Sequence, residues 1–381
     1  MKREPHVLVV GIDGVRYDSL LSAATPAVDC IARGGFLLPV TVHPRNVTIS
    51  GPVWATVATG VYADRHKVTG NSVHPPELAD FQDFTAVLRA SRPGSRTMIA
   101  ASWLPVAAPT ACGPLFSSRG WVPDKDPEEA NDGGSWASAD DAVARYAAGR
   151  LEKEDISASF VYFGQADVEA HNNGTGSGYV LAIQNCDMRL MTLLEAIKAR
   201  PNRRNEVWTI IVVTDHGHLD AGGHGGWSEE ERTAWIAACG ASVPEDVKAV
   251  DHADIFTQVL AAFGVTAGAA GGVPFGARCA GPEQLAPEQL APEPPARSPV
   301  PGTPAPGTAE ELPTRGAAPG TAEELPTRGA APGTAEELPT RSAAPGTAEE
   351  LPTRSAAPGT AEELPTRGAA PEPPARTAAL R

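Results

Sequence analysis

The sequence predicts an α/β fold, a three-layer α/β/α sandwich around a mostly parallel central sheet, followed by a disordered tail with repeats. Three observations lead to this prediction. Short apolar runs rich in β-branched residues are bounded by Gly, Asp or Pro, as buried strands are. Helical patterns lie between several of these runs, and strands that alternate with helices form parallel sheets covered on both faces. The C-terminal stretch contains too little apolar surface to fold.

The expected strands are short runs that end at turn-forming residues. In chain order they cover residues 6–12, 36–42, 97–101, 158–163 and 207–213. The helical pattern is clearest over residues 179–200, and a second one covers residues 252–263. Residues 103–138 are rich in Pro, Gly, Ser and Asp and are predicted to form long loops. Trp121 and Trp136 in this segment are expected to pack, with stacking on a substrate as the alternative.

The chain divides into a predicted folded domain, residues 1–270, and a Pro/Ala/Glu-rich tail, residues 271–381. The tail carries repeats of PGTAEELPTR, which start at Pro306, Pro319, Pro332, Pro345 and Pro358. Each copy has one Leu between two prolines, which cannot bury enough apolar surface to offset chain entropy. A solvated spacer is the expected role. A docking array is the alternative, and the sequence does not identify its partner.

Composition excludes several classes of protein. The net charge is −15, and the tail is acidic as well, so binding of nucleic-acid polymers through their phosphates is not expected. Five cysteines form no CxxC pair, which indicates reduced thiols rather than a disulfide framework. The N-terminus has only about five apolar residues in a row, short of a signal peptide. No apolar run is long enough to span a membrane. We therefore expect a cytoplasmic protein.

Three of the apolar runs are followed by an aspartate. Asp13 follows the first run, Asp167 the fourth and Asp215 the fifth. In an open α/β sheet, ligands bind beyond the carboxyl ends of the strands, so we expect the three carboxylates to converge in one crevice. Carboxylates that converge in this way repel one another unless a cation lies between them.

Histidines accompany these acids. His171 lies four residues after Asp167, His216 follows Asp215 directly, and His224 lies in a Gly-rich loop. Carboxylate and imidazole ligands together suit zinc or a similar divalent metal better than calcium or magnesium. Each pair alone has an ordinary explanation, since Asp often caps a helix and a lone His is usually structural. Their common position after strands favours a metal centre.

Ser50 is the candidate nucleophile. It precedes Gly51-Pro52 and a short helical pattern that closes at Gly60. Pro is favoured in a first helical turn and Ser at the cap before it, so a capping serine is the simple interpretation. The functional interpretation is that a metal activates this hydroxyl at the positive end of the helix, where phosphate oxygens can meet free N–H groups.

Taken together, these residues resemble the alkaline phosphatase superfamily, and within it the nucleotide pyrophosphatase/phosphodiesterase branch. The likeness covers about residues 6–265. It is carried by the segment TVATGVYADRHKV and by the ordered set Asp13, Ser50, Asn71, Asp167, His171, Asp215, His216 and His224. The family's spacing before Thr59 of that segment places its nucleophile at Ser50. The family's spacing after Thr59 places its substrate-binding Asn at Asn71.

The resemblance implies two divalent metal ions, with zinc as the first candidate and manganese or iron as alternatives. It assigns Asp13, Ser50, Asp215 and His216 to one ion, and Asp167, His171 and His224 to the other. Two such ions clamp the entering and leaving oxygens of an in-line displacement. Ser50 would attack phosphorus to give a phosphorylated or nucleotidylated serine. Asn71 and the Gly51 N–H would hold a non-bridging oxygen.

Two of these assignments have rivals. The branch usually has Thr as its nucleophile, and Thr48 lies two residues before Ser50. The last histidine comes later in longer members, so His252 is the alternative to His224. Flanking glycines permit close approach to a metal and favour His224. His218 and His66 are assigned to structure.

The expected activity is hydrolysis of a phosphoric ester of a small molecule, with nucleotides included. A phosphodiesterase or nucleotide pyrophosphatase is the first choice and a phosphomonoesterase the second. A sulfatase would need Arg at position 54, where this chain has Trp54. A cofactor-independent phosphoglycerate mutase would need a large inserted domain between Asn71 and Asp167. The non-enzyme alternative is a metal-stabilised scaffold, which the complete set of ligands and nucleophile argues against.

Overall fold

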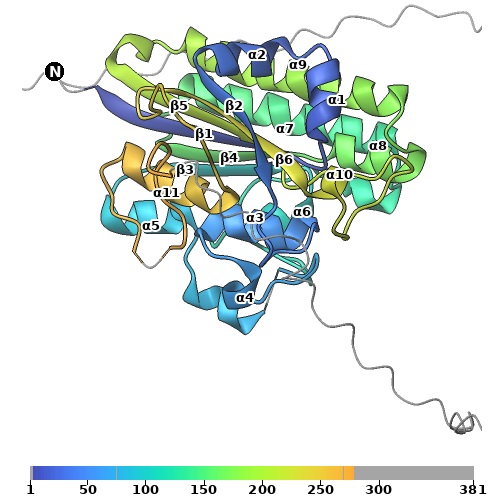
Figure 1. Cartoon of the computed structure of the whole chain (residues 1–381). Helices are drawn as coiled ribbons and strands as arrows, with labels where there is room; N and C mark the ends of the chain where they lie inside the picture. The colour runs from blue at the N-terminus through green and yellow to red at the C-terminus, as the bar shows by residue number, and fades with distance from the viewer. Residues whose placement is uncertain (1–2, 74, 269, 279–381) are drawn as a thin grey trace, which may run out of the picture. The chain divides into compact units, whose positions relative to one another are not determined.

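A six-stranded mixed sheet forms the centre of the protein. The computed structural model describes residues 3–73, 75–268 and 270–278 (Figure 1). In chain order the strands are β1 (Glu4–Ile12), β2 (Gly35–Thr41), β3 (Thr97–Ala101), β4 (Ala158–Phe163), β5 (Glu206–Val213) and β6 (Thr233–Gly240). Their order in the sheet is β2-β6-β5-β1-β4-β3. β5, β1, β4 and β3 are parallel, whereas β6 is antiparallel to both β5 and β2.

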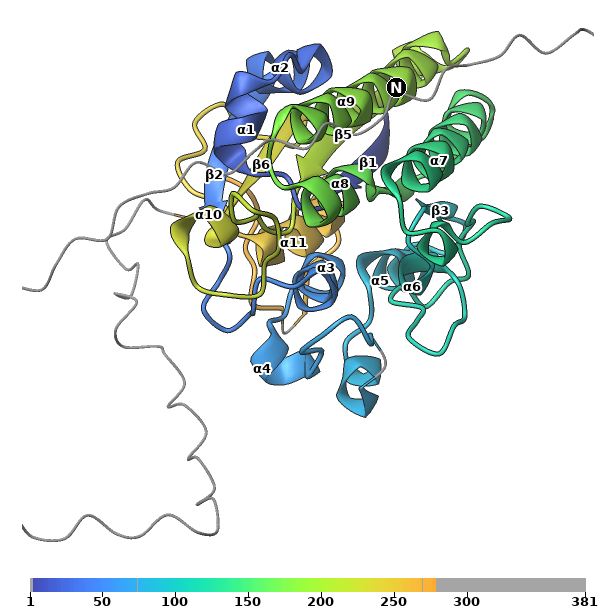
Figure 2. The same cartoon turned by 90° about the vertical axis from the view of Figure 1, so that its right-hand side faces the viewer.

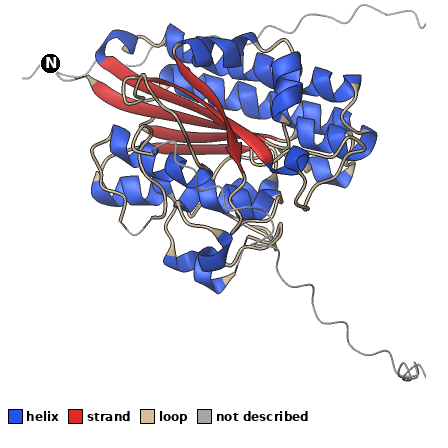
Figure 3. Cartoon of the chain, viewed as in Figure 1, coloured by secondary structure: helices blue, strands red, loops and turns tan. Residues whose placement is uncertain are grey.

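Helices cover both faces of this sheet (Figures 1 and 2). One face carries α3 (Ser50–Thr59), α5 (Phe84–Ser91), α6 (Leu104–Ala107) and α11 (His252–Ala262). The other carries α1 (Tyr17–Ser22), α2 (Pro26–Arg33), α7 (Gly133–Lys153), α8 (Gln165–Asn173) and α9 (Ser177–Ala199). The short helices are α4 (Ala63–His66), α10 (Glu229–Arg232), η1 (Pro76–Asp80), η2 (Pro127–Glu129) and η3 (Arg203–Asn205). Figure 3 shows the strands between the two helical layers, which confirms the predicted three-layer α/β/α sandwich.

The alternation of side chains along β1 explains the two apolar cores. Val7 and Val9 belong to the core on the α3 and α11 side, whereas Leu8 and Val10 belong to the core on the α7 and α9 side. Successive side chains of a strand point to opposite faces, so a fully apolar strand is stable only when both faces are covered. All four side chains are completely buried.

The sequence did not predict β6 or α7. β6 lies directly after the acidic helix α10, without a turn signal between them. The segment 103–138 that we expected to form loops contains α6 near its start and the beginning of α7 at its end, so the loop prediction is wrong for those residues. Trp136 lies in α7 and is buried, and the ring of Trp121 stacks on Tyr146 at 4.4 Å. Both tryptophans therefore pack, as expected.

The folded part extends beyond residue 270, where the sequence placed its end. Phe275 is buried, and its N–H donates to Gln258 Oε1 of α11 (3.0 Å). Arg278 donates two hydrogen bonds to Asp254. Compositional reasoning put the boundary too early because Gly and Ala dominate this segment while a single Phe anchors it. The predicted tail from residue 279 onward lies outside the described residues.

Two further expectations concern the described part of the chain. Within residues 3–73, 75–268 and 270–278, no helix is both long and apolar enough to cross a bilayer. Cys30, Cys112, Cys186 and Cys239 are free thiols.

Candidate active site

The carboxyl ends of the central strands bring the three predicted aspartates together. Asp13 directly follows β1, and Asp215 lies two residues after β5. Asp167 differs from our expectation, because it lies in the first turn of α8 rather than at the end of β4. The helix also places His171 one turn beyond Asp167, on the same side, as the four-residue spacing predicted.

Ser50 is the first residue of α3, and its hydroxyl does not cap the helix. The cap position is held by Ile49, whose side chain makes no capping hydrogen bond. The capping interpretation is therefore wrong. Ser50 Oγ instead donates to Asp13 Oδ1 (3.3 Å) and lies 3.3 Å from His216 Nε2.

The rival hydroxyl of Thr48 is engaged elsewhere. It accepts a hydrogen bond from Gly225 N (3.0 Å) and donates one to Gly226 O (2.9 Å). The side chain is fully buried. Thr48 therefore fastens the loop that carries His224, and Ser50 is the hydroxyl that faces the carboxylates.

The Asp13 carboxylate is held by two donors on one of its oxygens. Trp54 Nε1 and the Tyr162 hydroxyl donate to Oδ2 at 2.8 and 2.5 Å. The other oxygen, Oδ1, is the one that faces Ser50. Burial raises the pKa of Asp13 well above its usual range, and the charge of Asp167 adds to this effect. A buried carboxyl with raised pKa is stabilised in its charged form by a nearby cation.

Asp215 and His216 complete the first group of candidate ligands. Asp215 Oδ1 accepts from Gly14 N (3.0 Å), whereas Oδ2 is buried without a hydrogen-bond partner and lies 3.2 Å from His216 Nε2. His216 Nδ1 donates to Gly217 O (3.1 Å). Since a carbonyl can only accept, this bond puts the proton on Nδ1 and leaves the Nε2 lone pair free for a metal. Burial lowers the pKa of His216 well below its usual value, which keeps the ring neutral.

The second group surrounds Asp167. His224 Nδ1 donates to Thr48 O (2.7 Å), so its Nε2 atom is also left with a lone pair. This Nε2 lies 3.6 Å from Asp167 Oδ1 and 2.9 Å from His171 Nε2. His171 Nε2 lies 3.6 Å from Asp167 Oδ2, although its side chain is 43% exposed. The three predicted ligands of the second ion thus converge on one point.

His218 is a member of this group that the sequence analysis missed. We had assigned it to structure, but its Nε2 lies 2.8 Å from Asp167 Oδ1. Its other ring nitrogen is buried without a hydrogen-bond partner. The available signal was its place two residues after His216, at the start of the Gly-rich loop.

His252 and His66 contact other parts of the protein rather than the three site carboxylates. His252 Nε2 donates to Thr214 O (2.9 Å), which makes it a support for the end of β5. His66 Nδ1 accepts from Val68 N (3.0 Å), and burial lowers its pKa to about 4.

Asn71 lies beside the start of α3. The Gly51 N–H donates to Asn71 Oδ1 (3.1 Å), so this N–H is not free to bind a substrate oxygen as we expected. The bond orients the Asn71 amide instead, because it uses the carbonyl oxygen and leaves the Nδ2 hydrogens as donors. Adding a Cβ at Gly51 would place it 2.1 Å from Gly70 O, which explains the glycine at this close approach.

The donor atoms form two overlapping groups that could hold a metal ion. Asp13, Asp215 and His216 offer atoms within 4.8 Å of one another, and so do Asp167, His216, His218 and His224. The unpartnered Oδ2 of Asp215 and the free Nε2 atoms of His216 and His224 are what a cation would satisfy. Mixed carboxylate and imidazole donors suit zinc.

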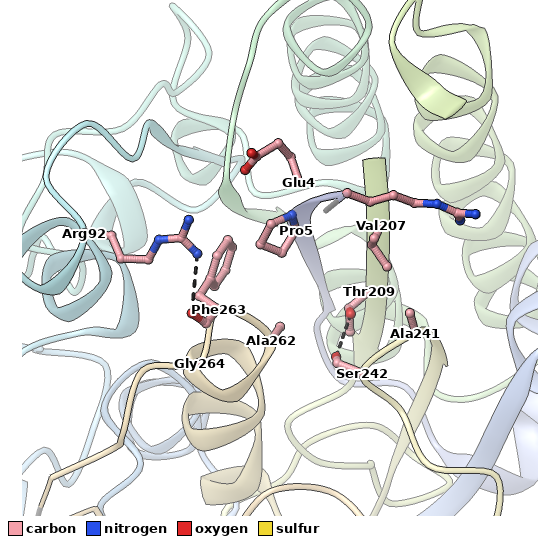
Figure 4. Close-up of a pocket in the computed structure, with 11 residues that line it drawn as sticks. Glu4, Pro5, Arg92, Val207, Thr209, Ala241, Ser242, Ala262, Phe263 and Gly264 are labelled. Carbon is pink, nitrogen blue, oxygen red and sulfur yellow. Dashed lines mark hydrogen bonds between the residues drawn. The ribbon is translucent and has the colours of Figure 1, made fainter. Parts of the chain in front are cut away.

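One cavity of the described residues lies away from this site. It has a volume of about 620 Å³ and lies where β1 and β5 begin, whereas the candidate ligands follow the ends of these strands (Figure 4). Its walls include Glu4, Val207 and Phe263, and none of the candidate ligands.

Solved structures with the same fold include several hydrolases. One is the murine ectonucleotide pyrophosphatase/phosphodiesterase 5 (16% identity, TM-score 0.52, covering 70% of this chain and 97% of that one). Another is the phosphonate monoester hydrolase of Agrobacterium radiobacter (18% identity, TM-score 0.53, covering 71% of this chain and 76% of that one). A third is a 2-O GAG sulfatase (15% identity, TM-score 0.55, covering 71% of this chain and 73% of that one). At such identities the likeness shows the fold alone.

The sequence itself gives the family. The family model of type I phosphodiesterase/nucleotide pyrophosphatase matches residues 7–228, which is more than half of the chain and includes every candidate site residue from Asp13 to His224. The chain belongs to the type I phosphodiesterase/nucleotide pyrophosphatase family of phosphoric ester hydrolases.

Proposed function

We propose that the protein is a metal-dependent phosphodiesterase or nucleotide pyrophosphatase in which Ser50 is the nucleophile. The observation that carries this proposal is the position of the Ser50 hydroxyl, 3.3 Å from both Asp13 Oδ1 and His216 Nε2. A nucleotide substrate is supported by the murine fold relative, which has been solved in complex with AMP.

In the first step Ser50 Oγ attacks phosphorus, a P–O bond to the serine forms, and the bond to the leaving alcohol or phosphate breaks. The hydroxyl proton has Asp13 Oδ1 as its acceptor. Trp54 and Tyr162 hold that carboxylate from its other oxygen, which keeps it in place during the attack. Water then attacks the same phosphorus, the P–O bond to Ser50 breaks, and the serine oxygen regains a proton as the phosphate product leaves.

Two divalent ions, with zinc as the first candidate, would supply charge neutralisation for the phosphoryl oxygens and would lower the pKa of the serine and of water. Asp13, Asp215, His216 and Ser50 would hold one of them. Asp167, His171 and His224 would hold the other, with His218 as an additional ligand or as a support for Asp167. The Nδ2 hydrogens of Asn71 would bind a non-bridging oxygen of the substrate.

Charge near the site favours a diester over a monoester. A monoester carries an additional negative charge, which an arginine close to the phosphate would stabilise. Arg16 is committed to Asp18 and Asp220, with hydrogen bonds of 2.6 Å to each. These bonds fasten the loop after His216 and compete with a phosphate for this guanidinium.

A sulfatase activity lacks its expected residue, although sulfatases are among the fold relatives. The maturation pattern requires Arg at position 54. Trp54 is fully buried there, and its indole donates to Asp13. Its role is to hold that carboxylate.

Hydrolysis of bis-p-nitrophenyl phosphate and p-nitrophenyl phosphate, with added zinc, tests the proposal. The wild-type protein is expected to prefer the diester. Ser50→Ala should lose activity by at least about 10³-fold, because a nucleophile acting together with its activating groups contributes on that scale. A preference for the monoester, or full activity of Ser50→Ala, would contradict the proposal.

A chain cut after residue 280 is the control for the tail, and it is expected to hydrolyse the diester as the full chain does. All candidate ligands lie between Asp13 and His224. The role of the tail beyond the folded part as a spacer and the cytoplasmic location stay predictions.

A further inference from the structure

The loop between β5 and α10 carries three histidines of the candidate site, His216, His218 and His224. Both ends of this loop return to one residue of α10, Glu231. At the first end, Gly217 N donates to the backbone oxygen of Glu231 (2.8 Å). At the far end, Gly226 N donates to the side chain of the same residue, at Oε1 (2.6 Å). Glu231 therefore closes the loop that delivers the imidazoles.

The Glu231 carboxylate does more than cap its own helix. Its Oε2 accepts from Ser228 N (3.1 Å), and Ser228 Oγ accepts from Glu231 N (3.3 Å), which together form the capping box of α10. A capping box needs only one carboxylate oxygen. The other oxygen reaches beyond the helix to Gly226 N, at the shorter distance. Since α10 has only four residues and so short a helix is marginal by itself, the second bond serves the loop.

This carboxylate is buried and held by backbone N–H groups. Glu231 is only 4% exposed, and burial of a carboxylate costs free energy unless hydrogen bonds offset it. Both of its oxygens accept such bonds, from Gly226 and Ser228. A Cβ at Gly226 would lie 2.7 Å from Oε2 and 2.9 Å from Oε1, so the close approach requires glycine. The contact is thus built from both sides.

The Gly226 peptide links this contact to a candidate ligand. Its N–H is held by Glu231, and its C=O accepts from the Thr48 hydroxyl (2.9 Å). The backbone oxygen of Thr48 accepts in turn from His224 Nδ1 (2.7 Å). His224 lies two residues before Gly226, so the held peptide fixes the backbone that carries this ring. The ring then presents Nε2 to Asp167, at 3.6 Å from Oδ1.

The two ends of the loop depend on different atoms of Glu231. The end next to His216 uses the backbone oxygen, which every amino acid supplies at this position. The bond that fixes the His216 ring goes to Gly217 O and does not involve Glu231 either. The end next to His224 uses the carboxylate, which a substitution removes. A change of this side chain should therefore loosen the second group of ligands and spare the first.

We propose that Glu231 is a positioning residue for the second metal site. Its carboxylate fixes the position and the tautomer of His224, and the metal affinity of Asp167, His171 and His224 depends on it. Glu231 itself contacts neither substrate nor metal. The inference rests on the proposed function, because it presumes that these three side chains hold a cation.

Nitrogen-15 NMR of the histidine rings tests the proposal in the full-length, metal-free protein. In wild type the Nδ1–H signal of His224 should be protected from exchange, since the side chain is 9% exposed and bonds to Thr48 O. In Glu231→Ala this signal should be lost or split between two tautomers. The Nδ1–H signal of His216 should persist, which also shows that the variant is folded.

Glu231→Gln is the milder variant. Its amide oxygen can accept from only one of the two N–H groups, because the amide nitrogen is a donor. It should weaken the zinc site that His224→Ala identifies by about 10- to 100-fold, the usual effect of losing a ligand's support. The other zinc site should stay within about threefold of wild type. In the His224→Ala background, Glu231→Gln should change zinc affinity no further, because the two residues act together.

Glu229→Gln is the matched control. It removes the same charge from the same short helix, but Glu229 is exposed. Both zinc sites should keep their affinity. An equal loss of zinc in Glu229→Gln would show that charge alone is responsible and would overturn the proposal.

These measurements need no turnover, so they separate this proposal from the proposed function. A wild-type protein that hydrolyses no diester would refute the proposed function and leave the role of Glu231 to the NMR and zinc data. A protected His224 signal in Glu231→Ala would reject that role. Equal weakening of both zinc sites by Glu231→Gln, or no weakening of either, would reject it as well.

Discussion

Two imidazoles of the candidate site are fixed in a single tautomer by backbone carbonyls. His216 donates through Nδ1 to Gly217 O, and His224 donates through Nδ1 to Thr48 O. Each ring therefore presents Nε2 to the carboxylates before any cation binds. Preorganised ligands lose little entropy when a metal enters, which favours tight binding.

Sequence reasoning reached the aspartates, Ser50 and His224 because each stands at a marked place, after an apolar run, before a proline or between glycines. It did not reach His218. The contact that distinguishes this residue joins it to Asp167 across 51 positions of the chain. Its place two residues after His216 was the one local signal, and that position alone does not separate a ligand from a structural histidine such as His252.

Replacing His218 by alanine should weaken zinc binding about 10- to 100-fold, the usual effect of losing a ligand's partner or support. The reason is the 2.8 Å contact between His218 Nε2 and Asp167 Oδ1. Zinc affinity measured by competition with a chromogenic chelator checks this prediction.

His252→Gln is the control for that measurement. Its amide can replace the bond to Thr214 O, so zinc affinity should stay within about twofold of wild type. If His252→Gln lost zinc while His218→Ala kept it, the assignment of the two histidines would have to be reversed.

At the scale of elements, five strands and the two clearest helices could be predicted to within two residues at each end. Their apolar runs and helical periodicity are local properties of the chain. β6 and α7 could not be predicted in the same way. β6 contains Ala and Gly, which have low strand propensity, and it owes its form to pairing with β5 and β2. α7 opens with Gly133-Gly134, which usually argues against a helix.

A buried polar network holds the start of α8. Because α8 carries Asp167, the position of Asp167 depends on the same network. The Asp140 carboxylate accepts from Gly164 N (3.0 Å) and Gln165 N (2.9 Å). Asp140→Ala leaves these donors buried without an acceptor, so we expect a loss of about 1–3 kcal/mol in the free energy of unfolding. Zinc affinity should fall as well, because α8 carries Asp167 and His171. Urea denaturation and zinc titration measure the two effects.

Asp141→Ala is the control, since its carboxylate bonds to Arg189 (2.7 Å) but is half exposed. It should lower the free energy of unfolding by less than about 1 kcal/mol.

Burial raises the pKa of Asp140 from 3.8 to about 6, so the folded protein holds the proton of this carboxyl more tightly than the unfolded chain does. The stability of wild type relative to Asp140→Asn should therefore fall as pH rises from about 4 to 6. A flat difference over that window would contradict the assignment.

For the whole molecule, removal of metal should lower thermal stability. Without cations, the buried Asp13 and Asp215 and the partly buried Asp167 repel one another. Zinc at one hundred times its Kd should stabilise the fold by about 2.7 kcal/mol, or roughly 5–10 °C in Tm for a domain of this size. Scanning calorimetry with a chelator, and then with excess zinc, measures the shift.

Asp215→Asn is the matched variant, because it removes one charge and a ligand from the same place. Its Tm should exceed that of the chelated wild type and respond less to zinc. Should zinc leave the Tm of the wild-type protein unchanged, the metal centre is refuted.

The position of β1 in the middle of the sheet affects the order of events during synthesis. Its neighbours are β4 and β5, which begin at Ala158 and Glu206, so the first strand to leave the ribosome cannot pair on both sides until β5 has been made. At about 5–20 residues per second, this apolar strand waits roughly 10–40 s. During that interval a nascent chain exposes Val7 to Val10 and cannot yet bring His216 or His224 to Asp13. Chaperone protection of the first segment, and late acquisition of metal, follow from the strand order alone.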